Sequence, residues 1–247
     1  MRRQRLAWVI GGLAVLAACG GQGGGSAENA KAPPVAARTK DSTGTVAASR
    51  APAAGAGDRR TVLFVGTSLT AGLGLDPDSA YPALIQRKID SAGLAYRVVN
   101  AGVSGETSAG ARQRMGWLLR QPFDVLVLET GANDGLRGTP VSETRENIQA
   151  IVDTVRRVRP GARIVLVQME ALPNLGQRYT RAFHETFPLL ARRNGLPLLA
   201  FLLDGVAAHP ALVQGDGLHP NDAGEKIVAA NVWRGLEPVL VGKRVGG

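Results

Sequence analysis

The stretch Thr61–Leu75, TVLFVGTSLTAGLGL, sets the pattern for the rest of the chain. Its four consecutive apolar residues, 62–65, predict a short strand buried on both faces of a parallel sheet. The strand stops at Gly66, and small hydroxylated residues follow, among them Ser68. Ligands bind at the carboxyl ends of such strands, so Ser68 stands where a nucleophile would stand. The same pattern also fits a plain turn in which Thr67 or Ser68 caps a helix.

Strands and helices alternate from this stretch towards the carboxyl terminus. Further short apolar strands are expected at residues 97–99, 124–128, 163–167 and 196–201, and helices at 80–92, 109–120, 142–157, 178–193 and 223–236. The alternation predicts an α/β fold, a flavodoxin-like doubly wound sheet of five parallel strands with helices on both faces. The sequence contains no internal repeat and no sign of a second domain.

Composition argues against several classes of function. The 247 residues allow one domain of ordinary size plus extensions. The chain has 29 Lys and Arg against 20 Asp and Glu, but no dense basic run with interleaved aromatic residues, so we expect no nucleic-acid partner. Neither GxxxxGK[ST] nor GxGxxG occurs, which argues against a phosphate loop. One cysteine and three histidines argue against a thiolate or histidine-rich metal site, and we expect neither metal nor cofactor.

The amino terminus has the pattern of a targeting segment. Arginines within residues 2–5 precede an apolar run at 6–18, which is too short to span a bilayer comfortably and suits a signal peptide. The run ends in LAAC at 16–19, which resembles the bacterial lipoprotein lipobox. That resemblance implies cleavage before Cys19 and lipidation of its thiol. The alternative is an ordinary secretory signal with an incidental cysteine.

The segment after Cys19 has a different composition. From Gly20 to Arg60 it contains no Leu, Ile, Phe, Met, Tyr or Trp, so it cannot bury enough apolar surface to offset its ordering entropy. We therefore expect a signal peptide at 1–18, a lipidated, disordered tether at 19–60, a folded domain at 61–241 and a flexible tail at 242–247. The expected location is the bacterial cell envelope, facing the periplasm and joined to a membrane through Cys19.

Polar residues that suit acyl transfer follow several of the predicted strands. They are Ser68, Gly105, Asn133, and Asp216 with His219. A parallel sheet brings such loops to one edge. A histidine would activate the serine as a general base, and a carboxylate three residues before it would hold the imidazole in its tautomer. Backbone N–H groups and an amide side chain would stabilise an oxyanion. Each of these short segments alone is more often an ordinary loop without a catalytic role. Together, and in this order after successive strands, they predict a catalytic site.

The four blocks VGTSLTAG, NAGVSGETS, TGANDGLRG and DGLHPN resemble those of the SGNH (GDSL-type) hydrolases. The likeness runs over about residues 61–240 and is greatest to the periplasmic acyl-CoA thioesterase/lysophospholipase/arylesterase group. By position, the resemblance implies that Ser68 is the nucleophile, His219 the general base and Asp216 the carboxylate that orients His219.

The resemblance also assigns the oxyanion hole to the N–H groups of Ser68 and Gly105 and the side chain of Asn133. The loop at 172–179 is similar to the segment that covers the acyl chain in relatives. One position departs from the family pattern: Thr67 stands where the family usually has Asp before the serine. Because that aspartate is not the base for the nucleophile, we expect the chemistry to survive.

The function implied is a serine esterase that cleaves carboxylic esters or thioesters (short acyl, aryl or lysolipid) through an acyl-enzyme intermediate, acting as a monomer. Two alternatives are a carbohydrate O-deacetylase of the same fold and a non-catalytic surface lipoprotein that binds at the sheet edge. Aromatic residues make up only 4% of the chain, which favours small acyl substrates over sugars. Hydrolysis of a p-nitrophenyl ester without added metal would distinguish an enzyme from a binding module.

Overall fold

The structure, a computed structural model, describes residues 59–242. The predicted signal peptide, the lipidation of Cys19, nearly all of the predicted tether and all but the first residue of the predicted tail lie outside the described residues.

Five parallel strands form one sheet in the order β2-β1-β3-β4-β5. They are β1 (Arg60–Gly66), β2 (Tyr96–Gly102), β3 (Val125–Leu128), β4 (Arg163–Gln168) and β5 (Leu198–Phe201). The register aligns Phe64 of β1 with Asn100 of β2 and Val127 of β3, so the carboxyl ends of these three strands meet at one edge. The predicted α/β fold with a five-stranded parallel sheet is confirmed.

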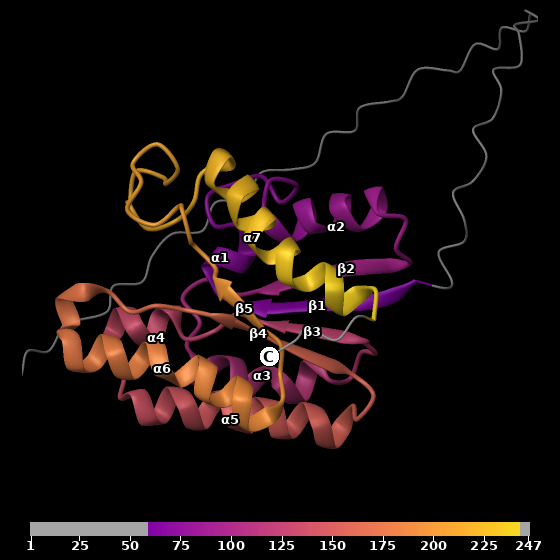
Figure 1. Ribbon diagram of the computed structural model, residues 1–247, viewed down its shortest axis with the longest axis horizontal. Helices are drawn as coiled ribbons and strands as arrows, with labels where there is room; N and C mark the ends of the chain where they lie inside the picture. Colours follow the sequence, from indigo (N-terminus) through magenta and orange to yellow (C-terminus); the bar gives the residue numbers. More distant parts are fainter. Residues whose placement is uncertain (1–58, 243–247) are drawn as a thin grey trace, which may run out of the picture. The chain divides into compact units, whose positions relative to one another are not determined.

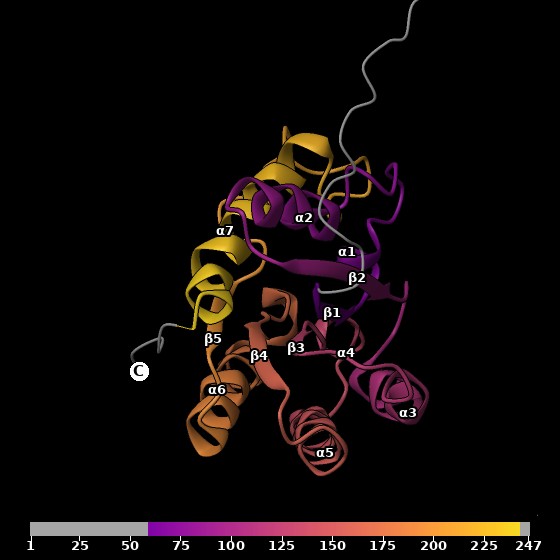
Figure 2. The same ribbon diagram turned by 90° about the vertical axis from the view of Figure 1, so that its right-hand side faces the viewer.

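Helices cover both faces of this sheet. They are α1 (Ser68–Ala71), α2 (Tyr81–Ser91), α3 (Ser108–Leu118), α4 (Ala132–Arg137), α5 (Val141–Val158), α6 (Gln177–Asn194) and α7 (Asp222–Leu240), with a 3₁₀ turn η1 at Pro173–Leu175. Figures 1 and 2 show α2 and α7 on one face and α3, α5 and α6 on the other. No helix among residues 59–242 has the length and apolar character needed to cross a membrane.

The central strands are apolar because both of their faces are covered. Every residue of β3 is buried, as are residues 61–66 of β1, whereas the edge strands β2 and β5 are partly exposed. Burying a Val, Leu or Phe side chain fully is worth about 1.5–3 kcal/mol, so this layer supplies a large share of the stabilisation. The loops after β1, β2 and β3 therefore start from one edge of a well-packed sheet.

Several element boundaries differ from the predicted ones. The short helix α4 was not predicted, and α1 was expected only in the alternative in which Thr67 or Ser68 caps a helix, because four and six residues are too few to show helical periodicity. The fifth strand begins at Leu198, since Pro197 has no N–H to donate, although its carbonyl accepts from Leu166. The last helix continues past Pro238 to Leu240, which packs in the core.

The order of the strands determines where a crevice opens. The chain moves outward from β1 to β2 and then returns across β1 to add β3, so the connections after β1 and β3 leave the sheet in opposite directions. In open α/β sheets, ligands bind at this switch point, outside the carboxyl ends of the strands. Ser68 follows β1 there, and Asn133 follows β3.

Candidate active site

Ser68 is the first residue of α1, directly after the turn that ends β1. Thr67 caps this helix, its side chain accepting from the N–H of Leu69, and Gly72 ends the helix in a left-handed conformation with a φ of +72°. Thr67 is thus the helix cap that the alternative interpretation of this stretch expected, and Ser68 still lies at the carboxyl end of β1. As the first helical residue, Ser68 has a backbone N–H without an intrahelical acceptor.

His219 lies between Ser68 and Asp216. Its Nε2 is 2.8 Å from Oγ of Ser68, and its Nδ1 is 2.5 Å from Oδ2 of Asp216. The side chain of His219 is 18% exposed and that of Asp216 is 44% exposed, so the carboxylate faces solvent while the imidazole is largely covered. With Nδ1–H donating to the carboxylate, Nε2 is free to accept the proton of Ser68.

The loop that carries this pair is held by its own hydrogen bonds. Oδ1 of Asp216 accepts from the backbone N–H groups of Leu218 (2.9 Å) and His219 (3.0 Å). The N–H of Leu218, then the imidazole and the N–H of His219, lower the pKa of Asp216 to about 2, so its carboxylate is ionised at neutral pH. The side chain of Gln214 donates to the carbonyl of Leu73, which ties this loop to the segment after α1.

Gly105 and Asn133 line the same cavity as Ser68 and His219. Gly105 follows β2 with a φ of +76°, a conformation that favours glycine. Asn133 is the second residue of α4, and its Nδ2 donates to the carbonyl of Glu106 at 2.9 Å. One N–H of the amide is held in this way, and the other remains for a ligand. The buried carboxylate of Asp134 accepts from Ser108, which fixes α4 against α3.

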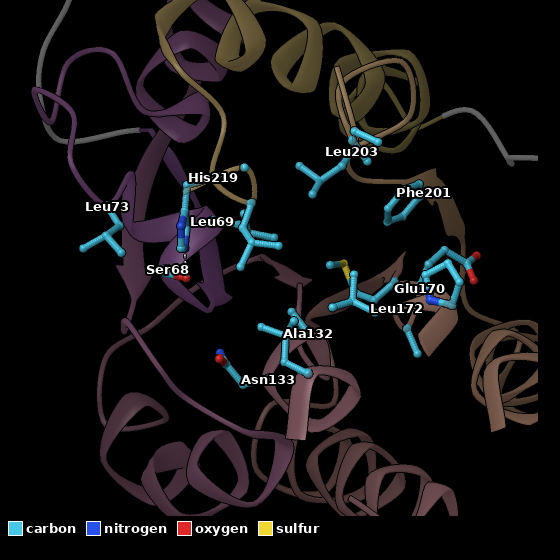
Figure 3. A pocket seen from close by; sticks show the side chains of 18 of the residues that line it. Ser68, Leu69, Leu73, Ala132, Asn133, Glu170, Leu172, Phe201, Leu203 and His219 are labelled. Carbon is cyan, nitrogen blue, oxygen red and sulfur yellow. Dashed lines mark hydrogen bonds between the residues drawn. The ribbon is translucent and has the colours of Figure 1, made fainter. Parts of the chain in front are cut away.

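A cavity of about 630 Å³ opens beside Ser68 and His219. Figure 3 shows these two side chains at one end and Phe201 and Glu170 at the other. Its lining is mostly apolar and includes Leu69, Ala132, Leu136, Met169, Leu172 and Leu203. From the predicted covering loop at 172–179, the residues Leu172 and Pro173 line the wall. A mostly apolar wall with a few polar groups at one end is typical of a site for a small molecule.

The two other histidines lie apart from the hydroxyl of Ser68. Nδ1 of His184 is 2.7 Å from Oε1 of Glu170, and the ring is exposed on α6. His209 lies in the loop between β5 and α7. Within residues 59–242, no three His, Cys, Asp or Glu side chains come together as a metal site would require.

The sequence alone did not indicate that Thr67 and Glu129 would form a pair beside Ser68. Glu129 follows β3 and is fully buried, and it accepts hydrogen bonds from Thr67. The sequence did carry a signal for Glu129. It directly follows the apolar run VLVL, and an acidic residue is rarely buried unless it has partners.

Comparison with known proteins agrees with this geometry. Residues 64–227 match the model of the GDSL-like lipase/acylhydrolase family. The chain is 38% identical to esterase TesA of Pseudomonas aeruginosa over 73% of its own length and 90% of TesA. It is 37% identical to thioesterase 1/protease 1/lysophospholipase L1 of Escherichia coli K12, over 73% of its length and 85% of that protein.

A solved structure shares the fold. The psychrotrophic esterase EstA from Pseudoalteromonas sp., inhibited by monoethylphosphonate, superposes with a TM-score of 0.70 at 32% identity, covering 74% of this chain and 100% of EstA. The chain belongs to the GDSL-like lipase/acylhydrolase family, the SGNH hydrolases, and is a serine ester hydrolase.

Proposed function

We propose that the chain hydrolyses carboxylic esters and thioesters through an acyl-enzyme intermediate on Ser68. The observation that carries the proposal is the chain of contacts from Ser68 Oγ to His219 and on to Asp216, at one end of an apolar cavity. A hydroxyl is a weak nucleophile, and a neutral imidazole 2.8 Å away is within reach of its proton.

In the first step, Ser68 Oγ bonds to the carbonyl carbon while its proton passes to Nε2 of His219. Asp216 stabilises the resulting imidazolium through Nδ1–H. His219 then returns the proton to the leaving alcohol or thiol as its bond to carbon breaks. In the second step, a water loses a proton to His219 and attacks the acyl carbon. The carboxylic acid leaves, and the proton returns to Ser68 Oγ.

The negative oxygen formed in each step needs donors aimed at its position. Ser68, Gly105 and Asn133 line the same cavity, and we assign the oxyanion hole to the N–H groups of the first two and the side-chain amide of Asn133. Figure 3 shows the amide of Asn133 directed towards the serine end of the cavity. Donors that are held in place before reaction stabilise the transition state without reorganisation.

The substrate class follows from the cavity wall. Its lining offers leucine, alanine, methionine and phenylalanine side chains to an acyl chain. A sugar ring would need several convergent hydrogen-bonding groups, and the described wall away from the catalytic residues carries one charged side chain, Glu170. The chain therefore suits acyl, aryl or lysolipid esters, and related thioesters, better than acetylated carbohydrate.

A phosphonate probe tests the assignment of the nucleophile. A fluorophosphonate forms a stable bond to an activated serine, and peptide mass spectrometry locates the adduct. We expect labelling on Ser68 and none on Ser104, the exposed serine beside Gly105. Labelling should be lost in the variant His219→Ala, because the hydroxyl then lacks its base. Labelling elsewhere, or none in the wild type, would contradict the proposal.

The lipobox motif supports a further part of this function. We infer that Cys19 carries lipid and anchors the enzyme, as a monomer, in the bacterial cell envelope with its active site facing the periplasm. Membrane fractionation of cells that express the full chain tests this. Wild type should sediment with membranes, and the variant Cys19→Ser should not. A variant that stays with the membranes would contradict anchoring at Cys19.

A further inference from the structure

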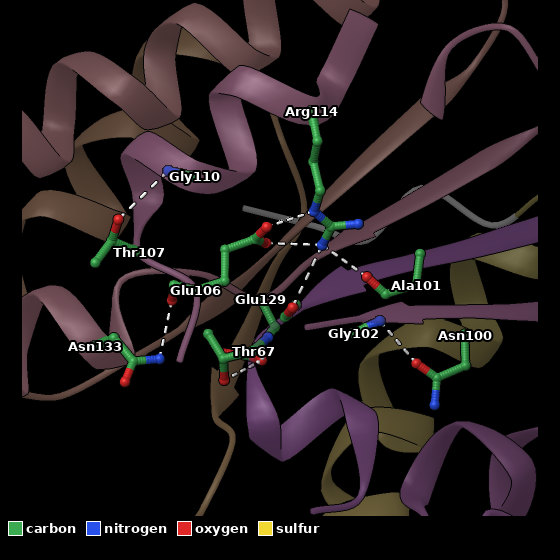
Figure 4. A network of polar contacts seen from close by, with 11 residues as sticks. Thr67, Asn100, Ala101, Gly102, Glu106, Thr107, Gly110, Arg114, Glu129 and Asn133 are labelled. Carbon is green, nitrogen blue, oxygen red and sulfur yellow. Dashed lines mark hydrogen bonds and ion pairs between the residues drawn. The ribbon is translucent and has the colours of Figure 1, made fainter. Parts of the chain in front are cut away.

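A buried carboxylate lies directly behind the turn that carries Ser68. Glu129, the residue after β3, has no solvent exposure. Its Oε2 accepts from the backbone N–H of Thr67 at 2.7 Å, from Thr67 Oγ1 at 2.9 Å and from Thr70 Oγ1 at 2.9 Å. All three donors belong to residues on either side of Ser68 in sequence, and Figure 4 shows the pair of Thr67 and Glu129.

The turn leaves no space for a side chain at Gly66 beside this carboxylate. A Cβ added to Gly66 would lie 2.6 Å from Oε2 of Glu129 and 2.0 Å from Oγ1 of Thr70. Gly66 must therefore be glycine so that β1 can pass next to the carboxylate. The hydroxyl of Thr70 also lies 2.7 Å from Oη of Tyr81, which is fully buried on α2. The network thus links the nucleophile turn to both β3 and α2.

An ion pair near Glu129 joins the loop after β2 to α3. Arg114 of α3 pairs with Glu106, the residue after Gly105, and donates to the carbonyl of Ala101 at the end of β2. Figure 4 places this pair next to Glu129. Burial raises the pKa of Glu129, and the donors from Thr67 and Thr70 oppose that shift. A buried carboxylate is costly unless several donors satisfy it, and here the satisfying donors are supplied by the nucleophile turn.

We propose that Glu129 is a positioning residue for the nucleophile, acting through Thr67 and Thr70. It holds the turn so that Ser68 Oγ faces His219 and the N–H of Ser68 faces the oxyanion. This inference rests on the proposed role of Ser68. It also gives Thr67 a function, because Thr67 both caps α1 and donates twice to Glu129, where an aspartate would set a second carboxylate against the first.

The test compares catalytic rate constants per active site. Wild type and variants are titrated with a fluorophosphonate, and kcat and KM for p-nitrophenyl butyrate are referred to the titrated sites, so a smaller folded fraction does not affect kcat. The variant Glu129→Gln keeps the volume but removes the negative charge that the three donors face, and it replaces one of the two acceptor oxygens with an NH₂ group. We expect its kcat to fall about 10- to 100-fold with little change in KM, since small misplacements of reacting groups have effects of this size.

Two further comparisons separate positioning from simple stability. Thr67→Val removes the hydroxyl and should lower kcat. Thr67→Ser retains the hydroxyl and should keep kcat near the wild-type value. Glu225→Gln is the control: Glu225 is a buried carboxyl group that accepts from the backbone N–H of Tyr81 and makes no hydrogen bond to Thr67, Thr70 or Glu129. This control should alter the melting temperature without altering kcat per titrated site.

The possible results separate the positioning role of Glu129 from the assignment of Ser68 as the nucleophile. Labelling of Ser68 with unchanged kcat in Glu129→Gln would overturn the positioning role and leave the nucleophile assignment intact. If Glu129→Gln does not fold, the pair of Thr67 variants decides, and equal kcat values for Thr67→Val and Thr67→Ser would overturn the role. A wild type in which Ser68 is not labelled would overturn both assignments.

Discussion

Oγ of Ser68 lies 2.8 Å from Nε2 of His219, although 151 positions separate the two residues in sequence. The parallel sheet explains this proximity. Ser68 follows β1, and His219 stands on the last loop before α7, which packs against β5 and α2. The contact is therefore a consequence of strand order, and the chemistry assigned to the site depends on it.

The amide of Asn133 should contribute to transition-state stabilisation. The variant Asn133→Ala should lower kcat by about 10²- to 10³-fold, with a smaller change in KM, because the amide is aimed at charge that develops during reaction. Steady-state kinetics with p-nitrophenyl butyrate measure this. Asn174→Ala, which removes an exposed amide from η1, is the control and should behave as wild type. An unchanged kcat in Asn133→Ala would remove that residue from the oxyanion hole.

The three histidines should differ sharply in their importance. His219→Ala should lower kcat by about 10³-fold or more, because Ser68 loses its base. His184→Ala and His209→Ala should retain the wild-type rate on p-nitrophenyl acetate. His184 contacts Glu170 at the far end of the cavity, and His209 lies in a loop. Loss of acetate hydrolysis in either of these two variants would contradict the assigned site.

The far end of the cavity should limit acyl-chain length. Leu203 lines the wall between His219 and Phe201 (Figure 3), and the variant Leu203→Trp would fill part of the space that the end of a long chain needs. We expect kcat/KM for p-nitrophenyl decanoate to fall by roughly ten-fold or more relative to the acetate ester, as several methylene contacts are lost. Val158→Trp, which adds the same bulk at an exposed position of α5, is the control. Equal losses on both esters would place the acyl chain elsewhere.

Stability should depend on pH through Glu225. Burial raises the pKa of Glu225 to about 8, from an ordinary value of 4.5. Between these two values the native state keeps a proton that the unfolded chain has released. The free energy of unfolding should therefore decrease as pH rises from about 4.5 to 8, by at most about 1.4 kcal/mol per pH unit for this one group.

The variant Glu225→Gln isolates this contribution, because the other titrating groups are common to both proteins. Urea unfolding of wild type and variant at pH 5.5 and pH 8 gives four free energies. The variant should gain stability relative to wild type at the higher pH, where the buried carboxylate of wild type becomes charged. A difference between the two proteins that does not change with pH would show that Glu225 titrates normally.

Much of the fold follows from local patterns in the sequence. The apolar run before Gly66 identifies a central strand, and the alternation of strands and helices identifies a parallel sheet with helices on both faces. The residues proposed for catalysis could be located for the same reason, since each belongs to a segment of small or polar residues that follows a strand. The short helix α4 escaped prediction because it is too short to show a period.

The role of Glu129 could not have been predicted in the same way. Its donors, Thr67 and Thr70, are about sixty positions away, and only the pairing of β1 with β3 brings them together. The apolar cavity is likewise assembled from several loops, so its wall has no contiguous signal in the sequence. Such features depend on tertiary contacts, and local propensities carry little information about them.

The central claim is that Ser68 is the nucleophile of a serine esterase, and one measurement tests it most directly. The full chain and its Ser68→Ala variant are assayed without added metal on p-nitrophenyl esters from acetate to dodecanoate. Wild type should hydrolyse the esters with a chain-length optimum set by the cavity, and Ser68→Ala should be folded but inactive on all of them. Turnover retained in Ser68→Ala, or a wild type inactive on every ester, would contradict the account.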